Sequence, residues 1–71
     1  MTKTALQKLD KKSRATLKDI SNAIEGKAKD TAKYKFALHG YLDCLMDLGI
    51  ITDEEWYALY TYYTRRENAV L

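Results

Sequence analysis

The most informative part of this sequence is residues 40–63, which read GYLDCLMDLGIITDEEWYALYTYY. This segment contains a leucine-rich run, a short turn that begins at Gly49, and an aromatic run that follows Thr52. Glycine adopts at little cost the positive φ with which many helices end. Thr52 and Glu55 have the spacing of a capping box, in which each side chain accepts a hydrogen bond from the other residue's backbone N–H. These signals predict two helices joined by a tight turn.

The helical pattern continues on both sides of this segment. The chain has 71 residues with no proline and three glycines, so little in it interrupts a helix. Apolar residues recur every three or four positions, which predicts helices over residues 4–25, 30–48 and 52–66. Because the last two are joined by so short a connection, we expect them to pack antiparallel. The sequence therefore predicts one all-α domain over residues 1–71, a three-helix fold that ends in an antiparallel helical hairpin.

An alternative arrangement has one long central helix. The apolar spacing continues across Gly26 in a heptad register, so the alternative is a single helix from about residue 14 to residue 48, especially in a dimer. Gly26 itself, and Lys27 at a position facing the partner helix, argue against this arrangement. Where the first helix instead ends near residue 25, Gly26 occupies its C-cap.

The apolar stripes of the last two predicted helices define the expected core. It consists of Leu42, Leu45, Leu48, Ile51, Trp56, Leu59 and Tyr60. Cys44 lies at the edge of this stripe, and we expect it to be a small buried residue. Gly40 costs about 1 kcal/mol relative to alanine inside a helix, so we expect it to allow the close approach of a neighbouring helix.

Composition limits the classes of function. One cysteine cannot form an internal disulfide, and Cys44 with His39 gives too few ligands for structural zinc. The cysteine is unpaired, as is usual in a reducing compartment. We see no secretory signal and no apolar run of about 20 residues, so we expect a cytoplasmic protein without membrane contact. His39, Asp43 and Asp47 form one polar stripe that we expect to be solvated rather than metal-binding. With no nucleophile beside a base and no phosphate-binding loop, we expect no enzyme, cofactor or small-molecule substrate.

Charge is distributed unevenly along the chain. Residues 1–35 carry ten Lys or Arg and four Asp or Glu, a net charge of +6, whereas residues 36–71 carry two and six, a net charge of −4. Such polarity favours a partner that is steered electrostatically. One hypothesis is a nucleic-acid-binding regulator that neutralises phosphates with the basic side of the first helix. The residues involved would be Lys8, Lys11, Lys12, Arg14 and Lys18.

Aromatic side chains exceed what one helix face can hold. At 100° per residue, Tyr57 and Tyr62 point away from the face shared by Trp56 and Tyr60, and Phe36 lies nearly opposite the apolar stripe of its helix. Exposed aromatic rings are good contact makers in protein interfaces. We therefore expect Phe36, Tyr57 and Tyr62 to form a surface for a protein partner or for a homodimer.

The run from Gly40 to Trp56 resembles the C-terminal part of small helical accessory proteins from phages and integrative elements of Gram-positive bacteria. In this sequence the resemblance rests on a helix, the turn Asp47-Leu48-Gly49, and the cap Thr52-Asp53-Glu54-Glu55. It implies a regulatory or inhibitory binder, a class that includes inhibitors of host defence such as anti-CRISPR proteins. The leading hypothesis is thus a non-enzymatic protein that regulates or inhibits by binding another protein.

Overall fold

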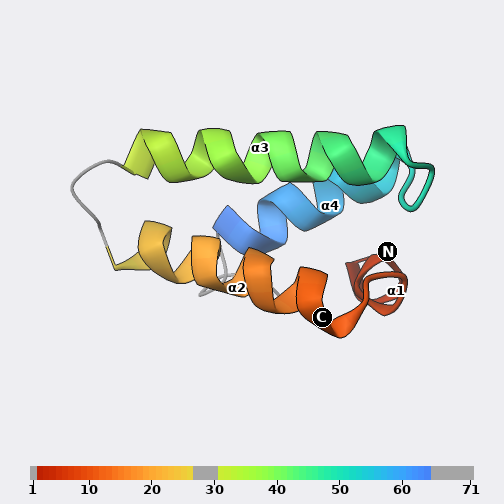
Figure 1. Cartoon of the computed structure of the whole chain (residues 1–71), viewed down its shortest axis with the longest axis horizontal. Coiled ribbons are helices and arrows are strands. Elements are labelled where there is room, and N and C mark those ends of the chain that lie inside the picture. The colour runs from red at the N-terminus through yellow and green to blue at the C-terminus, as the bar shows by residue number, and fades with distance from the viewer. Residues whose placement is uncertain (1, 27–30, 65–71) are drawn as a thin grey trace.

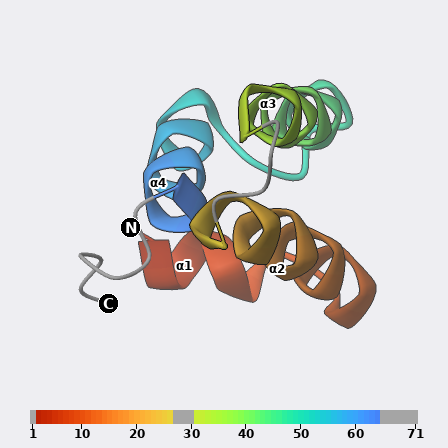
Figure 2. The same cartoon turned by 90° about the vertical axis from the view of Figure 1, so that its left-hand side faces the viewer.

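The computed structural model describes residues 2–26 and 31–64, which form four helices and no strand (Figure 1). The helices are α1 (Thr2–Gln7), α2 (Lys11–Glu25), α3 (Thr31–Asp47) and α4 (Asp53–Thr64). α2 and α3 pack against each other, α4 folds back from the end of α3, and α1 packs against α4 (Figures 1 and 2). The predicted all-α fold with its C-terminal hairpin is confirmed. The alternative of one long central helix is wrong, because α2 and α3 are separate helices in mutual contact.

The first predicted helix, over residues 4–25, is in fact two helices, because Asp10 starts a new one. Asp10 has an extended backbone, with φ −74° and ψ 171°, and its side chain accepts a 2.6 Å hydrogen bond from the N–H of Ser13. That bond satisfies a free donor of the first turn of α2, and it lowers the pKa of the Asp10 carboxyl. The break lets α1 turn toward α4 and bury Ala5, together with Leu9 in the connection.

The turn between α3 and α4 has the predicted geometry. Gly49 has φ 76°. Its N–H donates to the carbonyl of Met46 at 2.9 Å, and the N–H of Ile50 donates to the carbonyl of Leu45 at 3.0 Å. This pair of bonds is a Schellman motif, in which a left-handed residue closes the helix. Gly26 also caps its helix, but with a φ of −71° that any residue can adopt.

The capping box at the start of α4 is also confirmed. The N–H of Thr52 donates to Oε1 of Glu55 at 2.8 Å, and the N–H of Glu55 donates to the Thr52 hydroxyl at 3.2 Å. Two N–H groups of the chain at the start of α4 are thereby satisfied by side chains. The expected first residue of the middle helix, Asp30, and the expected last residue of the final helix, Arg66, lie outside the described residues.

Among the described residues, the largest apolar side chains that are fully buried come from α2, α3 and α4, and they are Leu17, Leu38, Leu42 and Leu59. Trp56 and Tyr60, which were expected in the core, pack against it but are only half-buried. Two further expectations were wrong. Leu48 is 69% exposed because it follows the last turn of α3, and Cys44 is exposed on α3 rather than buried. The expectation that Gly40 allows the close approach of a neighbouring helix was also wrong, because no atom of another described helix lies within 4 Å of the place where its Cβ would be.

One buried polar contact joins α2 to α4. The hydroxyl of Ser21, which is fully buried, donates a 2.6 Å hydrogen bond to the backbone carbonyl of Tyr63. Because buried polar groups are costly when unpaired, this bond fixes how the two helices approach each other. None of the four helices has the length and apolar character that crossing a bilayer requires.

Candidate protein-binding surface

The large apolar side chains that the described residues leave exposed all belong to α3, α4 or their connection. They are Phe36 at 80%, Tyr57 at 70%, Leu48 at 69% and Ile50 at 38% exposed. On α1 and α2, as far as they are described, the large apolar residues are buried or half-buried. Concentrated apolar exposure on one half of a small protein is typical of an interaction site.

Aromatic rings of α3 and α4 meet around Trp56. The ring of Tyr60 stacks on the indole with centroids 5.2 Å apart and an interplanar angle of 4°. The rings of His39 and Tyr57 meet the indole edge to face, with centroids at 4.8 Å and 5.2 Å. Rings held in this way lose little freedom on binding, which favours their use as rigid contacts.

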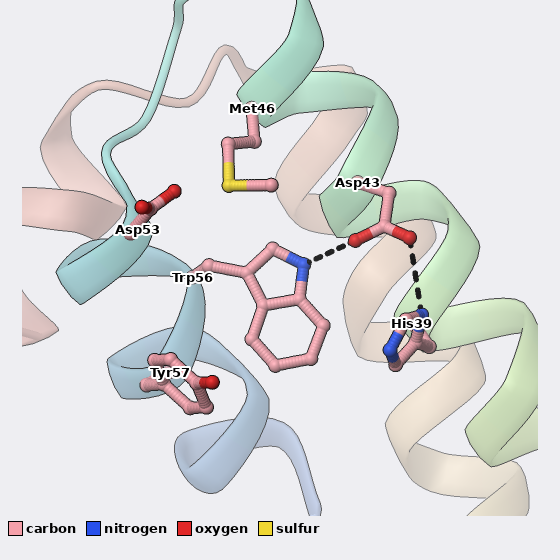
Figure 3. A pocket seen from close by; sticks show the side chains of 6 residues that line it. All are labelled: His39, Asp43, Met46, Asp53, Trp56 and Tyr57. Atoms are coloured by element: carbon pink, nitrogen blue, oxygen red, sulfur yellow. Dashed lines mark hydrogen bonds and ion pairs between the residues drawn. The ribbon is translucent and has the colours of Figure 1, made fainter.

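Trp56 lies in an open depression between α3 and α4, with a volume of about 320 Å³ (Figure 3). We call it the Trp56 depression; its lining residues are His39, Asp43, Met46, Asp53, Trp56 and Tyr57. Figure 3 shows the indole broadside in the middle of this space, with Asp43 and His39 on the α3 side. A ligand in the depression would therefore meet an aromatic ring face, two carboxylates and the thioether of Met46.

Asp43 positions two of these rings. Its Oδ1 accepts a 2.8 Å hydrogen bond from Nε1 of Trp56, and its Oδ2 lies 3.2 Å from Nδ1 of His39 (Figure 3). The i, i+4 spacing on α3 brings His39 and Asp43 to the same side of the helix. The carboxylate thus connects α3 to α4 at the surface and holds the indole in place.

A second depression, also of about 320 Å³, adjoins the first through His39. It is lined by Ala32, Lys35, Phe36, His39 and Tyr60. His39 lines both depressions, so Phe36 and Tyr57 lie toward the two ends of one surface. We call this surface the aromatic face and define it by Phe36, His39, Trp56, Tyr57 and Tyr60.

Tyr62, the third predicted contact residue, lies elsewhere. It is half-buried and lines a separate depression of about 220 Å³ with Leu6, Arg14, Lys18 and Tyr63. Its ring meets that of Tyr63 edge to face, with centroids 5.0 Å apart. The structure therefore brings Phe36 and Tyr57 to the aromatic face but places Tyr62 beside two cationic side chains of α2.

The basic residues predicted for nucleic acid fall into two groups. Lys11, Lys12, Arg14 and Lys18 are all exposed on α2. Lys8 lies instead in the connection after α1, where its ammonium nitrogen is 2.8 Å from Oε1 of Glu55. This ion pair and the cap at Thr52 lower the pKa of the Glu55 carboxyl, with the hydrogen bond from Lys8 as the larger cause.

The three residues of the polar stripe of α3 do not converge on one point. His39 pairs with Asp43, and Asp47 is exposed. Within residues 2–26 and 31–64, no three His, Cys, Asp or Glu side chains are arranged to hold a metal ion.

Sequence reasoning missed the role of Trp56, which was assigned to the core and is half-buried in the wall of a depression. The four-residue spacing of His39 and Asp43 was visible, but nothing local indicated that Asp43 reaches across to the next helix. Searches against protein-family models, curated proteins and solved structures found no match to this chain.

Proposed function

We propose that this chain is a non-enzymatic interaction protein that regulates or inhibits a protein partner by binding it through the aromatic face. The observation that carries the proposal is the exposure of Phe36, at 80%, and of Tyr57, at 70%, toward the two ends of one hollowed surface. Both rings stay in water in the isolated chain, and covering them would stabilise a complex.

The character of the surface fits a protein partner better than a small molecule. Aromatic residues and Met are enriched in the buried centres of protein interfaces, and Met46 lines the Trp56 depression beside the rings of this face. Each depression, with a volume of about 320 Å³, has room for a side chain of a partner. Leu48 and Ile50, exposed in the connection between α3 and α4, extend the apolar surface available for burial.

We also propose a biological setting for this binding, in a phage or an integrative element. The segment from Gly40 to Trp56 resembles accessory proteins of phages and integrative elements, and that resemblance implies a regulator or an inhibitor of host defence. A cytoplasmic location fits the same setting. A homodimer formed through the aromatic face would cover the proposed contact residues and leave the function to another surface, so the oligomeric state is the first property to measure, by sedimentation over a range of concentrations.

The test is affinity capture from host cells with matched variants. Phe36→Ser with Tyr57→Ser removes two exposed rings while keeping similar helix propensity, so the fold should be retained. We expect this double variant to lose a partner that the unmodified chain captures. Lys11→Ser with Lys12→Ser, on the exposed side of α2, is the control and should keep it. Equal capture by both double variants would contradict the proposal.

A second candidate function is binding of nucleic acid through α2. The observation that favours it is the exposure of Lys11, Lys12, Arg14 and Lys18 without an ion pair to any of the described residues. Phosphate contacts of this kind make affinity fall steeply with salt. A gel-shift assay at low and moderate salt should show such binding, and Lys11→Glu with Arg14→Glu should abolish it. Absence of binding at low salt would eliminate this candidate.

A further inference from the structure

The charge around the Trp56 depression has one sign. Asp43 and Asp53 line it, and no Lys or Arg is among its lining residues as far as the chain is described. The surrounding sequence is equally one-sided, because residues 36–64 contain five Asp or Glu and no Lys or Arg. Of these five acids, Glu55 is neutralised by Lys8 and is buried away from the surface. Asp43 and Asp53 therefore give a negative charge to the Trp56 depression, which Tyr57 also lines.

Two neighbouring side chains fix the orientation of the Trp56 indole. Tyr60 stacks on it, and Asp43 accepts the hydrogen bond from its Nε1. A cation over an indole face is attracted by the ring quadrupole, most strongly when carboxylates nearby add their charge and water is displaced. Asp43 keeps lone pairs beyond those used by Trp56 and His39, so it can accept a further hydrogen bond from a ligand.

We propose that the Trp56 depression takes an arginine side chain from a basic segment of the protein partner, an inference that rests on the proposed binding function. Arginine suits the site better than lysine because its planar guanidinium can stack on the indole while its N–H groups donate to a carboxylate. Asp43 on α3 and Asp53 on α4 flank the ring from opposite sides (Figure 3). Phe36, at the other end of the face and next to Lys35, would contact an apolar part of the same partner.

A second copy of this chain is the competing occupant. Arg14 and Lys18 are exposed on α2, and α2 lies across the molecule from the α3–α4 surface that holds the depression (Figure 2). Insertion of α2 of one copy into the depression of the next would join head to tail and produce open chains rather than a closed dimer. Salt-sensitive self-association that disappears in Asp43→Asn with Asp53→Asn would show this occupant and overturn the proposal of a separate partner.

The test uses the one tryptophan of the chain as its reporter. A capped tetra-arginine peptide is titrated into the isotope-labelled full chain at low ionic strength, and the indole N–H resonance of Trp56 is followed. The matched probe is a capped tetra-citrulline peptide, which has nearly the same shape without the charge. We expect a saturable shift with tetra-arginine and none with tetra-citrulline. Equal shifts with the two peptides would overturn the proposal.

Variants locate the binding. Asp43→Asn with Asp53→Asn should weaken tetra-arginine binding at least about tenfold, the loss expected for removing charge-assisted contacts. Asparagine keeps an oxygen for Nε1 of Trp56, so the fold and the indole position should be retained. Asp47→Asn, exposed on α3 outside the depression, is the control and should bind like the unmodified chain. Equal weakening by Asp47→Asn would mean diffuse attraction and would overturn the proposal.

The two proposals fail separately. If tetra-arginine does not bind but the variant of Phe36 and Tyr57 still loses its captured partner, the arginine site is wrong and the protein-binding function stands. If tetra-arginine binds as expected but capture is indifferent to Phe36 and Tyr57, the proposed function is wrong.

Discussion

The ammonium nitrogen of Lys8 lies 2.8 Å from Oε1 of Glu55, the same oxygen that accepts the backbone N–H of Thr52. One carboxylate therefore caps α4 and also holds the connection between α1 and α2 against it. The side chain of Glu55 is 7% exposed and that of Lys8 is 41% exposed, so the pair lies at the edge of the core. Lys8 thus has a structural role that its neighbours on α2 do not share.

This contact predicts how stability depends on pH. The pKa of Glu55 is lowered from its ordinary value of 4.5, so the folded state favours the charged form and its contribution is complete well above that pH. Stability should fall as the pH drops from about 4.5 through the lowered pKa. Glu55→Gln should be less stable than the unmodified chain at pH 7, and the difference should shrink in acid, because both side chains are then neutral. Urea midpoints at several pH values measure this.

The control for that experiment is Glu54→Gln, an exposed neighbour in the first turn of α4. Its only expected effect is the loss of a favourable charge near the helix N-terminus, about 0.3–1 kcal/mol at neutral pH. A difference between Glu55→Gln and the unmodified chain that stays constant down to pH 3 would contradict the structural role of the Lys8–Glu55 pair.

Two glycines should respond to alanine in opposite directions. Gly40 lies inside α3 with open space around its missing Cβ, so Gly40→Ala should stabilise the fold by up to about 1 kcal/mol. Gly49 has φ 76°, where a side chain is strained, so Gly49→Ala should destabilise it by about 1 kcal/mol. Chemical denaturation of both variants measures the difference. A destabilising Gly40→Ala would mean that another helix or a partner contacts this position.

The buried hydroxyl of Ser21 should contribute more than its size suggests. Ser21→Ala removes the donor to the Tyr63 carbonyl and should cost about 1–3 kcal/mol of unfolding free energy. Thr16→Ala is the matched control on α2, since the Thr16 hydroxyl donates to the Lys12 carbonyl within its own helix, and its effect should stay within about 0.5 kcal/mol. Equal effects of the two substitutions would show that the contact between α2 and α4 is not needed.

Local signals predicted the α3–α4 hairpin well because its determinants are adjacent in sequence. Gly49 closes α3, and the Thr52–Glu55 capping box opens α4. The break at Asp10 was missed because its signal is a single side chain within a run of good helix formers. The reason for the break, the packing of α1 on α4, involves residues about fifty positions apart.

Part of the candidate site was predicted because the side of a helix on which a residue lies, like the signals of the hairpin, depends on residues that are close in sequence. Helical geometry alone indicated that Phe36 and Tyr57 would be exposed, and they are. It could not indicate that Trp56 would line a depression, because that depends on how α4 crosses α3. Nor could it separate Tyr62 from the other two rings, since the position of α2 beside α4 decides what lies next to Tyr62.

The affinity of the captured partner, once purified, for the Phe36→Ser, Tyr57→Ser double variant tests the role of the aromatic face most directly. We predict binding at least about tenfold weaker than to the unmodified chain, with a melting temperature that barely changes because both rings are exposed. Unchanged affinity, or a loss of affinity accompanied by a large fall in melting temperature, would contradict the assignment of Phe36 and Tyr57 as contact residues.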